Sequence, residues 1–340
     1  MGPPDKPSKP GLAYLSGMQL DFPFPSTRLQ SLRTGAIVVP DQPAIFRVYG
    51  SGALTCLQGL LTNDLAAPGD GSLVYGAMLS AKGMILFDAW VLREASGITL
   101  ITSACARTGA LELFRRTLPP RLAKVADLTD THRVAWFLGA AAPERLARAA
   151  GVSIPGHGNV LRMGPEDRWL AAGGTPTAPF TALLIAEADA IADLARRFEK
   201  AGSTLGTLPD LTASWVLSGW PVLGREIDEK TLPPEVRFDE LGGVSYTKGC
   251  YTGQETVARI HFRGHVNRSL RGLTIEGNAP LDDRTLMLAG KDVGGVRSAL
   301  ILEDRVMALG MVRREVETGA ALTVSGRNAQ VAALPFCVTA

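Results

Sequence analysis

The side chains with the widest range of chemistry are concentrated in one short segment, residues 246–259. The segment contains a thiol, an ammonium, a guanidinium, a carboxylate, an amide and two phenols, which a purely structural segment rarely needs. Gly249 and Gly253 flank the thiol of Cys250, so the backbone can adopt positive φ or approach a ligand closely on both sides of it. This pattern predicts a shaped loop with Cys250 as its reactive atom.

The residues after this loop predict a helix. Glu255 and Arg259 are four residues apart and would be neighbours on one helix face. Cys250 would then lie just before a helix N-terminus, with Lys248 two residues away, and both features stabilise a thiolate. We therefore expect Cys250 and Lys248 to be the catalytic residues.

Length and composition limit the classes of protein to consider. A chain of 340 residues is long enough for two or three domains, and 46% hydrophobic residues are ample for their cores. The formal net charge of +2 predicts no overall field for nucleic acid or acidic membranes, so any anion site must be local. The four cysteines lie far apart, without CxxC or zinc spacing, which argues against disulfides or a metal site and favours a reducing compartment.

The two ends of the chain differ in pattern. Residues 1–17 are rich in proline and polar side chains and lack the apolar core of a secretion signal, so we expect a disordered tail. Beyond residue 263, short apolar segments recur about every ten residues between Gly, Asn and Asp, which is typical of a small antiparallel barrel. No apolar run approaches the roughly 18 residues that a membrane span needs.

Between these ends, short strand and helix patterns alternate. Residues 44–49 are rich in β-branched and aromatic side chains, and residues 188–201 form an amphipathic helix with Ile191, Leu194 and Phe198 on one side. Antiparallel hairpins among these units indicate an α+β fold rather than a doubly wound sheet. We expect four parts: the tail at 1–17, one α+β module at 18–140, a second at 141–263 that ends in the Cys250 motif, and a barrel at 264–340.

The Cys250 motif resembles a known family. Residues 248–255, Lys-Gly-Cys-Tyr-Thr-Gly-Gln-Glu, followed by Arg259, are similar to the signature of the YgfZ-type folate-binding proteins, which include iron–sulfur cluster assembly factors. Segments 57–64, 224–228 and 293–298 resemble the wider group around the glycine-cleavage T-protein. The resemblance implies a ring of two ferredoxin-like α+β modules and a C-terminal antiparallel β-barrel around a folate-sized hole.

Tetrahydrofolate is the cofactor that this resemblance implies. Its pterin needs planar hydrogen-bonding partners, its aromatic linker favours aromatic walls, and its glutamate tail attracts cations. Chemistry suggests one set of residues for these roles: Asp64, Gln254 and Glu255 for the pterin, Tyr251 and Trp220 for the walls, and Arg259, Arg263 and Arg268 for the tail. Asp64 has an alternative role at a helix end, where its side chain would bond nearby backbone.

The function that the resemblance implies is that of an accessory protein. Such a protein would bind tetrahydrofolate and support iron–sulfur cluster assembly or repair through Cys250, with cluster-bearing client or assembly proteins as partners. One cysteine cannot hold a cluster alone, so a partner would supply the other ligands. The implied location is the bacterial cytoplasm or, in a eukaryote, the mitochondrial matrix, with no membrane and no direct nucleic-acid partner.

Two alternatives stay open: a folate-dependent aminomethyltransferase or demethylase, and a scaffold that binds no folate. The catalytic aspartate of aminomethyl transfer should follow Lys82 and Gly83 closely, but Asp88 comes one or two positions late. Because a slip of one residue in a strand turns a side chain to the opposite face, we expect Asp88 to miss this role. Trp215 and Leu217 also stand where those enzymes commonly have arginine and glutamate. Classical turnover is therefore not expected.

Overall fold

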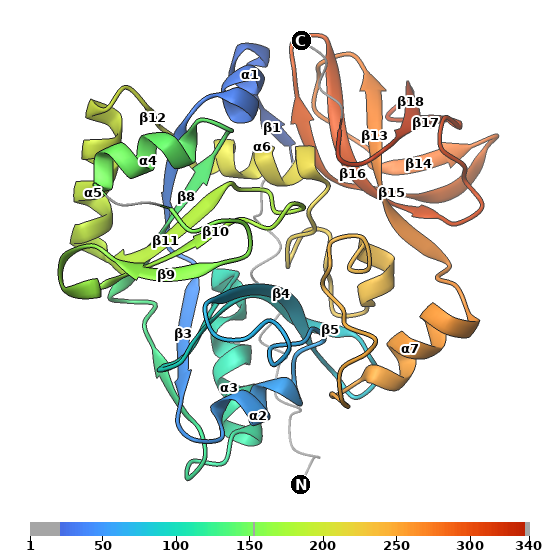
Figure 1. The fold of residues 1–340 in the computed structure, drawn as a ribbon. Coiled ribbons are helices and arrows are strands. Elements are labelled where there is room, and N and C mark those ends of the chain that lie inside the picture. The colour runs from blue at the N-terminus through green and yellow to red at the C-terminus, as the bar shows by residue number, and fades with distance from the viewer. Residues whose placement is uncertain (1–20, 152–153, 337–340) are drawn as a thin grey trace, which may run out of the picture.

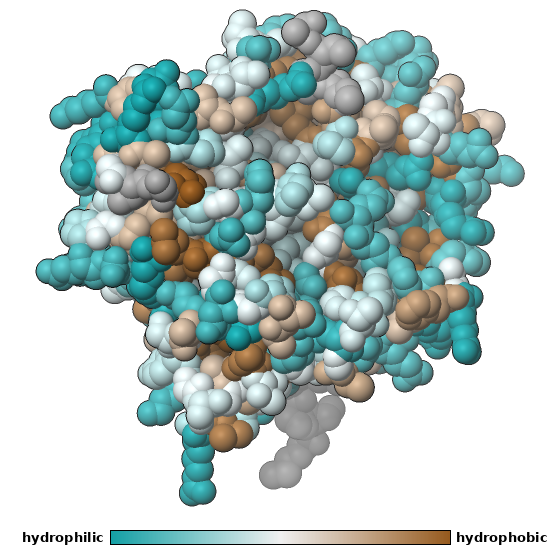
Figure 2. Space-filling view, in the orientation of Figure 1, coloured by the Kyte–Doolittle hydropathy of each residue, from teal (hydrophilic) through white to brown (hydrophobic). Residues whose placement is uncertain are grey.

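A computed structural model of the protein describes residues 21–151 and 154–336. The expected tail at 1–17 lies outside the described residues. Two α+β sheets and a β-barrel are arranged around the middle of the molecule (Figure 1). Figure 2 shows the same face, hydrophilic at its rim, with hydrophobic side chains gathered toward the hollow in the middle. The expected mixed α+β class is confirmed.

The first sheet has the strand order β4-β5-β6-β3-β7, and all its pairings are antiparallel. Its strands are β3 (Ala44–Tyr49), β4 (Ser72–Leu79), β5 (Ile85–Glu94), β6 (Gly97–Thr102) and β7 (Lys124–Asp127). Helices α2 (Ala53–Gln58) and α3 (Arg107–Thr117) pack on it, and Phe46 and Phe87 meet Phe114 of α3 edge to face. Every residue of β4 is buried, so both faces of this strand are covered.

The second sheet has the order β12-β2-β8-β11-β10-β9. Its strands are β2 (Ile37–Asp41), β8 (His132–Leu138), β9 (Val160–Met163), β10 (Trp169–Gly173), β11 (Ala182–Glu187) and β12 (Thr204–Leu205). Helices α4 (Ala142–Ala150) and α5 (Ala188–Lys200) belong to this module. The amphipathic helix predicted at 188–201 is confirmed, because Ile191, Leu194 and Phe198 of α5 are all buried.

The sheets do not follow the boundary expected between residues 140 and 141. Strands β2 and β8 come from the first expected module, yet they pair with each other and with β11 and β12. Pairing register rather than distance along the chain decides which sheet a strand joins, and a sequence pattern carries no register.

The C-terminal barrel closes on itself. Its strands are β13 (Arg268–Glu276), β14 (Thr285–Leu288), β15 (Lys291–Ile301), β16 (Arg305–Arg313), β17 (Ala321–Val324) and β18 (Arg327–Ala332). Antiparallel pairings run from β13 through β16, β15, β14, β17 and β18 back to β13. Strand β1 (Asp21–Pro23) adds to β15 in parallel. The predicted barrel is confirmed.

Helices α1 (Ser26–Thr34) and α6 (Leu208–Ser218) and the segment that leads to α7 (Gln254–Arg263) connect these parts. Short 3-10 turns at Ala104–Ala106, Pro165–Asp167 and Pro233–Val236 complete the described elements. One continuous apolar core contains Tyr75, Trp136 and Leu309, which come from the two sheets and the barrel. None of the helices in the described parts of the chain has the length and apolar character needed to cross a bilayer.

Candidate functional site

The Cys250 motif forms a loop that leads directly into α7. The helix begins at Gln254, after Gly253 in the left-handed conformation with φ 81°. A Cβ on Gly253 would lie 2.5 Å from the carbonyl oxygen of Ser80, so only glycine fits there. At Gly249, by contrast, a Cβ would meet no described atom within 4 Å. Cys250 is exposed and lies four residues before the first residue of α7.

Lys248 holds this loop against the turn that follows α2. The side chain is 8% exposed, and its ammonium donates three hydrogen bonds. The acceptors are the carbonyl oxygens of Gln58 at 2.6 Å, Leu61 at 2.7 Å and Asn63 at 2.9 Å. An ammonium has three N–H donors, so all of them are used. Burial lowers the pKa of Lys248 to about 8, which leaves it charged at neutral pH. Its contacts in the structure are those of a residue that positions the loop.

Further hydrogen bonds join the same two segments, which are almost two hundred residues apart in sequence. Thr62 Oγ1 donates to the carbonyl oxygen of Gly243 at 2.6 Å, and Asn63 Nδ2 donates to that of Gly242 at 2.6 Å. The amide of Thr252 donates to the carbonyl oxygen of Gly59 at 3.1 Å. Segment 57–64, which carries part of the resemblance, and segment 242–252, which includes the first residues of the Cys250 motif, therefore form one unit.

Asp64 is used within this unit. Its Oδ1 accepts hydrogen bonds from Gln58 Nε2 at 2.8 Å and from the amides of Ala66 and Ala67 at 2.7 and 3.1 Å. Desolvation, which raises the pKa of Asp64, is outweighed by these bonds, so its pKa lies below the usual value. This geometry matches the alternative in which the side chain bonds nearby backbone.

The other predicted ligand residues lie on or beside α7. Tyr251 is 7% exposed, and the centroid of its ring lies 5.1 Å from the Lys248 ammonium. Its hydroxyl has no hydrogen-bond partner among the described residues. Burial raises the pKa of Tyr251 to about 12. Gln254 is half-buried, whereas Glu255 and Arg259 are exposed.

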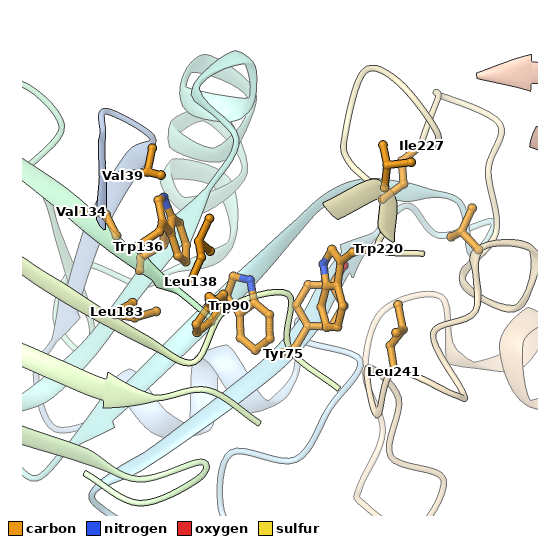
Figure 3. Close-up of a cluster of buried hydrophobic side chains, with 14 of the residues drawn as sticks. Val39, Tyr75, Trp90, Val134, Trp136, Leu138, Leu183, Trp220, Ile227 and Leu241 are labelled. Carbon is orange, nitrogen blue, oxygen red and sulfur yellow. The ribbon is translucent and has the colours of Figure 1, made fainter. Parts of the chain in front are cut away.

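A separate cavity of about 400 Å³ lies between the α+β sheets, α6 and the segment 220–225. Four of the five tryptophans of the chain line it, namely Trp90, Trp136, Trp215 and Trp220. The rings of Trp90 and Trp220 are stacked, with centroids 5.0 Å apart and planes 18° apart (Figure 3). A cavity of this size lined by aromatic side chains is typical of a site for a small molecule.

Asp88 on β5 lines this cavity. Tyr75 donates its hydroxyl to Asp88 Oδ2 at 2.9 Å, while Oδ1 is shielded and has no hydrogen-bond partner among the described residues. Burial raises the pKa of Asp88 to about 6 against the opposing effect of the Tyr75 hydrogen bond. An enclosed carboxyl with a displaced pKa is a common feature of functional sites.

The expectation that Asp88 would face away from such a site is wrong, and the reason is a β-bulge. Met78 pairs with Phe87 and Leu79 with Ile85, so Leu86 has no partner on β4. An unpaired extra residue shifts the alternation of side chains by one position. The bulge at Leu86 thus corrects the late position of Asp88 and turns its carboxyl to the cavity.

Two further groups at the cavity are a cation and a thiol. Arg225 is 8% exposed; its Nε has no hydrogen-bond partner among the described residues but forms an ion pair with Glu226 Oε2 at 3.9 Å. Cys105, in the turn before α3, is exposed and lines the cavity. Burial and the nearby Asp88 raise the pKa of Cys105. The cavity therefore offers a carboxyl, a guanidinium and a thiol between aromatic walls.

The structure does not gather the predicted site residues around this cavity. Cys250, Lys248 and the residues predicted for the pterin are not among those that line it, whereas Trp220 is. Cys105 and Arg225 were not predicted, and no local pattern marks them, because the four tryptophans beside them in the cavity are spread from residue 90 to residue 220. In the described ranges 21–151 and 154–336, no group of three or more His, Cys, Asp or Glu could hold a metal ion.

Comparison with known proteins agrees with this architecture. Residues 39–155 match the family model described as the GCVT N-terminal domain. The tRNA-modifying protein YgfZ of Cronobacter sakazakii is 26% identical over 286 residues, which cover 81% of this chain and 84% of that protein. The tRNA-modifying protein YgfZ of Escherichia coli O157:H7 is 28% identical over 239 residues, covering 69% of this chain and 70% of that protein.

Among solved structures, the glycine cleavage system aminomethyltransferase T from Bartonella henselae has the same fold. It superposes with a TM-score of 0.73 at 18% identity, over 90% of this chain and 87% of that one. The ring of two α+β modules and a barrel that the motif implied is thus confirmed as the fold. The chain is thus similar to the YgfZ proteins along most of its length and has the glycine-cleavage T-protein fold, as the Cys250 motif indicated.

Proposed function

We propose that this chain binds a reduced folate in the aromatic cavity and acts as an accessory protein in tRNA modification or a related iron–sulfur process through Cys250. The name of the YgfZ relatives supports the link to tRNA modification, and the fold supports the link to folate. The cavity and the exposed thiol are the two features of this chain that such a role would use.

The observation that carries the proposal is the unpartnered Oδ1 of Asp88 inside an aromatic cavity. A shielded polar atom without a partner is costly, so such a site favours a ligand that donates a hydrogen bond. The amino group and ring N–H groups of a pterin are such donors, and its aromatic ring suits a cavity lined by indole side chains. Arg225 would attract the acidic end of the same ligand.

Asp88, Arg225 and the tryptophans would therefore hold the folate, in place of the residues predicted from the sequence. When bound, a reduced folate carries one-carbon groups. Asp88 would orient the pterin through a hydrogen bond, and the surrounding indoles would exclude water from it.

Cys250 would act outside this cavity. The thiol is exposed on a loop that Lys248 and the 57–64 turn hold in place, so a partner protein can reach it. A single thiolate cannot complete an iron–sulfur cluster, so a cluster-bearing client or assembly protein would supply the remaining ligands.

Aminomethyl transfer is a second candidate, and the position of Asp88 favours it. The carboxyl faces the cavity and has a pKa raised to about 6, which suits a general acid or base near neutral pH. Formation of methylene-tetrahydrofolate from aminomethyl donors would reveal this activity. Turnover that survives the Cys250→Ala substitution would favour the transferase over the accessory role.

Folate binding can be measured by the quenching of tryptophan fluorescence during an anaerobic tetrahydrofolate titration. We expect Asp88→Ala to weaken binding about 10- to 150-fold, because a hydrogen bond to a charged group contributes about 1.5–3 kcal/mol. Asp282→Ala, at an exposed site on the barrel, is the matched control. Equal affinity in the Asp88→Ala variant would exclude the cavity as the folate site. Failure of the wild type to bind tetrahydrofolate at millimolar concentration would support the alternative of a scaffold that binds no folate.

The role of the thiol is tested separately in a strain that lacks the gene. We expect Cys250→Ala to fold and to bind folate like the wild type but to fail to restore the activity of iron–sulfur enzymes and tRNA modification. Cys105→Ala is the control for loss of an exposed thiol. Full restoration by Cys250→Ala would contradict a working thiol at this position.

A further inference from the structure

Helix α7 leaves most of its surface without a partner in the fold. Val257 is its one buried residue, and the structure describes all ten residues of this helix. Residues 261–265, His-Phe-Arg-Gly-His, are all exposed. Phe262 is 67% exposed, the largest fraction among the large hydrophobic side chains in the described part of the chain. In Figure 2 the surface at the lower right, where Figure 1 places α7, shows hydrophobic side chains bordered by hydrophilic ones.

The exposed phenylalanine belongs to a group of three rings. Tyr246 and His261 are stacked with ring centroids 3.7 Å apart, and Phe262 meets them edge to face at 5.8 and 4.8 Å. Asp239 holds the stack, because it accepts a hydrogen bond from the Tyr246 hydroxyl and lies 3.3 Å from His261 Nδ1. The rings are therefore held in place before any partner arrives, which lowers the entropy cost of binding.

Two guanidinium groups flank this aromatic group. Arg259 and Arg263 are four residues apart and so lie on one side of α7, next to Phe262 in the sequence. Neither makes a hydrogen bond or an ion pair with any residue that the structure describes, whereas Arg107 and Arg268 are paired with carboxylates. The one carboxylate of α7, that of Glu255, lies in its first turn.

We propose that the α7 patch, made of Tyr246, Arg259, His261, Phe262 and Arg263, binds single-stranded RNA. A base would stack on the exposed face of Phe262, and the two arginines would contact the flanking phosphates. The proposal rests on the role in tRNA modification proposed above. It replaces the expectation of no direct nucleic-acid partner, which came from a net charge of +2 that says nothing about a local patch.

The aromatic group favours RNA over an acidic peptide. Carboxylates of a peptide would pair with Arg259 and Arg263 but would leave the flat face of Phe262 without a matching partner. An unpaired nucleotide offers a planar base and a phosphate together. Because only two cations are involved, the affinity should be moderate and should fall as salt rises.

The test is fluorescence anisotropy of a labelled RNA stem–loop with the full chain, repeated from about 50 to about 200 mM salt. We expect Phe262→Ala to weaken binding about 5- to 150-fold, the range typical of one stacked base. The double variant R259Q/R263Q should bind more weakly and make the slope of log affinity against log salt shallower by about 1.4. Tyr49→Ala and R115Q/R116Q, at exposed sites on the first module, should bind like the wild type.

Three results would overturn the proposal: no RNA binding by the wild type at low salt, equal binding by Phe262→Ala, or equal loss in the control variants. Displacement of the RNA by polyglutamate, with the same dependence on Phe262, would point to an acidic protein instead. Tetrahydrofolate titration of the same variants should be unchanged, because the patch does not line the cavity. Loss of RNA binding with folate binding intact thus separates this proposal from the proposed folate site.

Discussion

Replacement of Asp88 by asparagine should stabilise the protein at neutral pH and weaken ligand binding at the same time. The carboxyl faces the cavity, has one oxygen without a partner among the described residues, and has a pKa raised to about 6. Asparagine has nearly the same shape, and its carbonyl oxygen can still accept the hydrogen bond from Tyr75. The substitution therefore removes the charge while it keeps the packing.

The size and sign of the effect follow from proton binding. An unfolded aspartate has a pKa of about 3.9, so between about pH 4 and pH 6 the folded protein binds more protons than the unfolded chain. The free energy of unfolding then falls as pH rises through this range, and the stability conferred by the protonated carboxyl is lost above about pH 6. A difference of two in pKa corresponds to about 3 kcal/mol. Removal of the charge should stabilise Asp88→Asn by up to this amount at pH 7.5. Because its amide nitrogen finds no acceptor, which offsets part of the gain, we expect about 1–3 kcal/mol.

Urea unfolding of both proteins at pH 4.5 and pH 7.5, followed by circular dichroism, measures this difference. The advantage of Asp88→Asn should be largest at pH 7.5 and shrink below about 1 kcal/mol at pH 4.5. Asp282→Asn, at an exposed site, should stay within about 0.5 kcal/mol of the wild type at both values. A variant that is less stable than the wild type at pH 7.5, or a gain that does not depend on pH, would refute the assignment of a strained carboxyl.

Three further predictions concern the motif loop and the cavity thiol. Lys248→Met should lose about 3–5 kcal/mol of unfolding free energy, because three carbonyl oxygens lose a charged donor. Lys230→Met, at an exposed site, should lose less than about 0.5 kcal/mol. Similar losses in the two variants would argue against the three hydrogen bonds of the Lys248 ammonium. In urea unfolding, Gly253→Ala should lower the free energy of unfolding by about 1 kcal/mol or more beyond the loss in Gly290→Ala. Both glycines have φ near 80°, but only at Gly253 does an atom lie 2.5 Å from the added Cβ. Equal losses would contradict the steric argument. Alkylation of Cys105 at neutral pH, followed by peptide mass spectrometry, should be faster in Asp88→Asn than in the wild type. The reason is that Asp88, besides burial, raises the pKa of this thiol. An unchanged rate would show that burial alone raises the pKa of Cys105.

The local elements of the site could be predicted because their causes are local. The glycines and polar side chains at 246–253 indicated a loop, and the helical spacing after it indicated α7, which begins at Gln254. The positive φ of Gly253 could be expected from a glycine just before a helix. The steric need for glycine there comes from Ser80, a residue distant in sequence, and could not be predicted. The apolar stripe of α5 and the spaced strands of the barrel were likewise visible as periodicity.

The cavity could not be predicted, because its walls come from distant parts of the chain. Trp90 lies on β5, Trp136 on β8, and Trp215 and Trp220 at the end of α6 and just after it. The side on which Asp88 appears depends on the unpaired Leu86, and a bulge leaves no clear mark in the sequence. The sequence suggested that the charge of Lys248 stabilises a thiolate at Cys250. In the structure the Lys248 ammonium instead donates its hydrogen bonds to carbonyl oxygens of segment 58–63, which no sequence pattern indicated.

The amino-acid sequence by itself determined the class of fold, the barrel at the C-terminus, the loop and helix around Cys250, and the resemblance to YgfZ-type proteins. These features depend on residue types at short spacing, which the chain carries whether or not it is folded. The tertiary structure alone decided that Asp88, Cys105 and four tryptophans share one cavity while Cys250 lies outside it. It also decided which strands share a sheet, because strand register and packing between distant segments arise only when the whole chain folds.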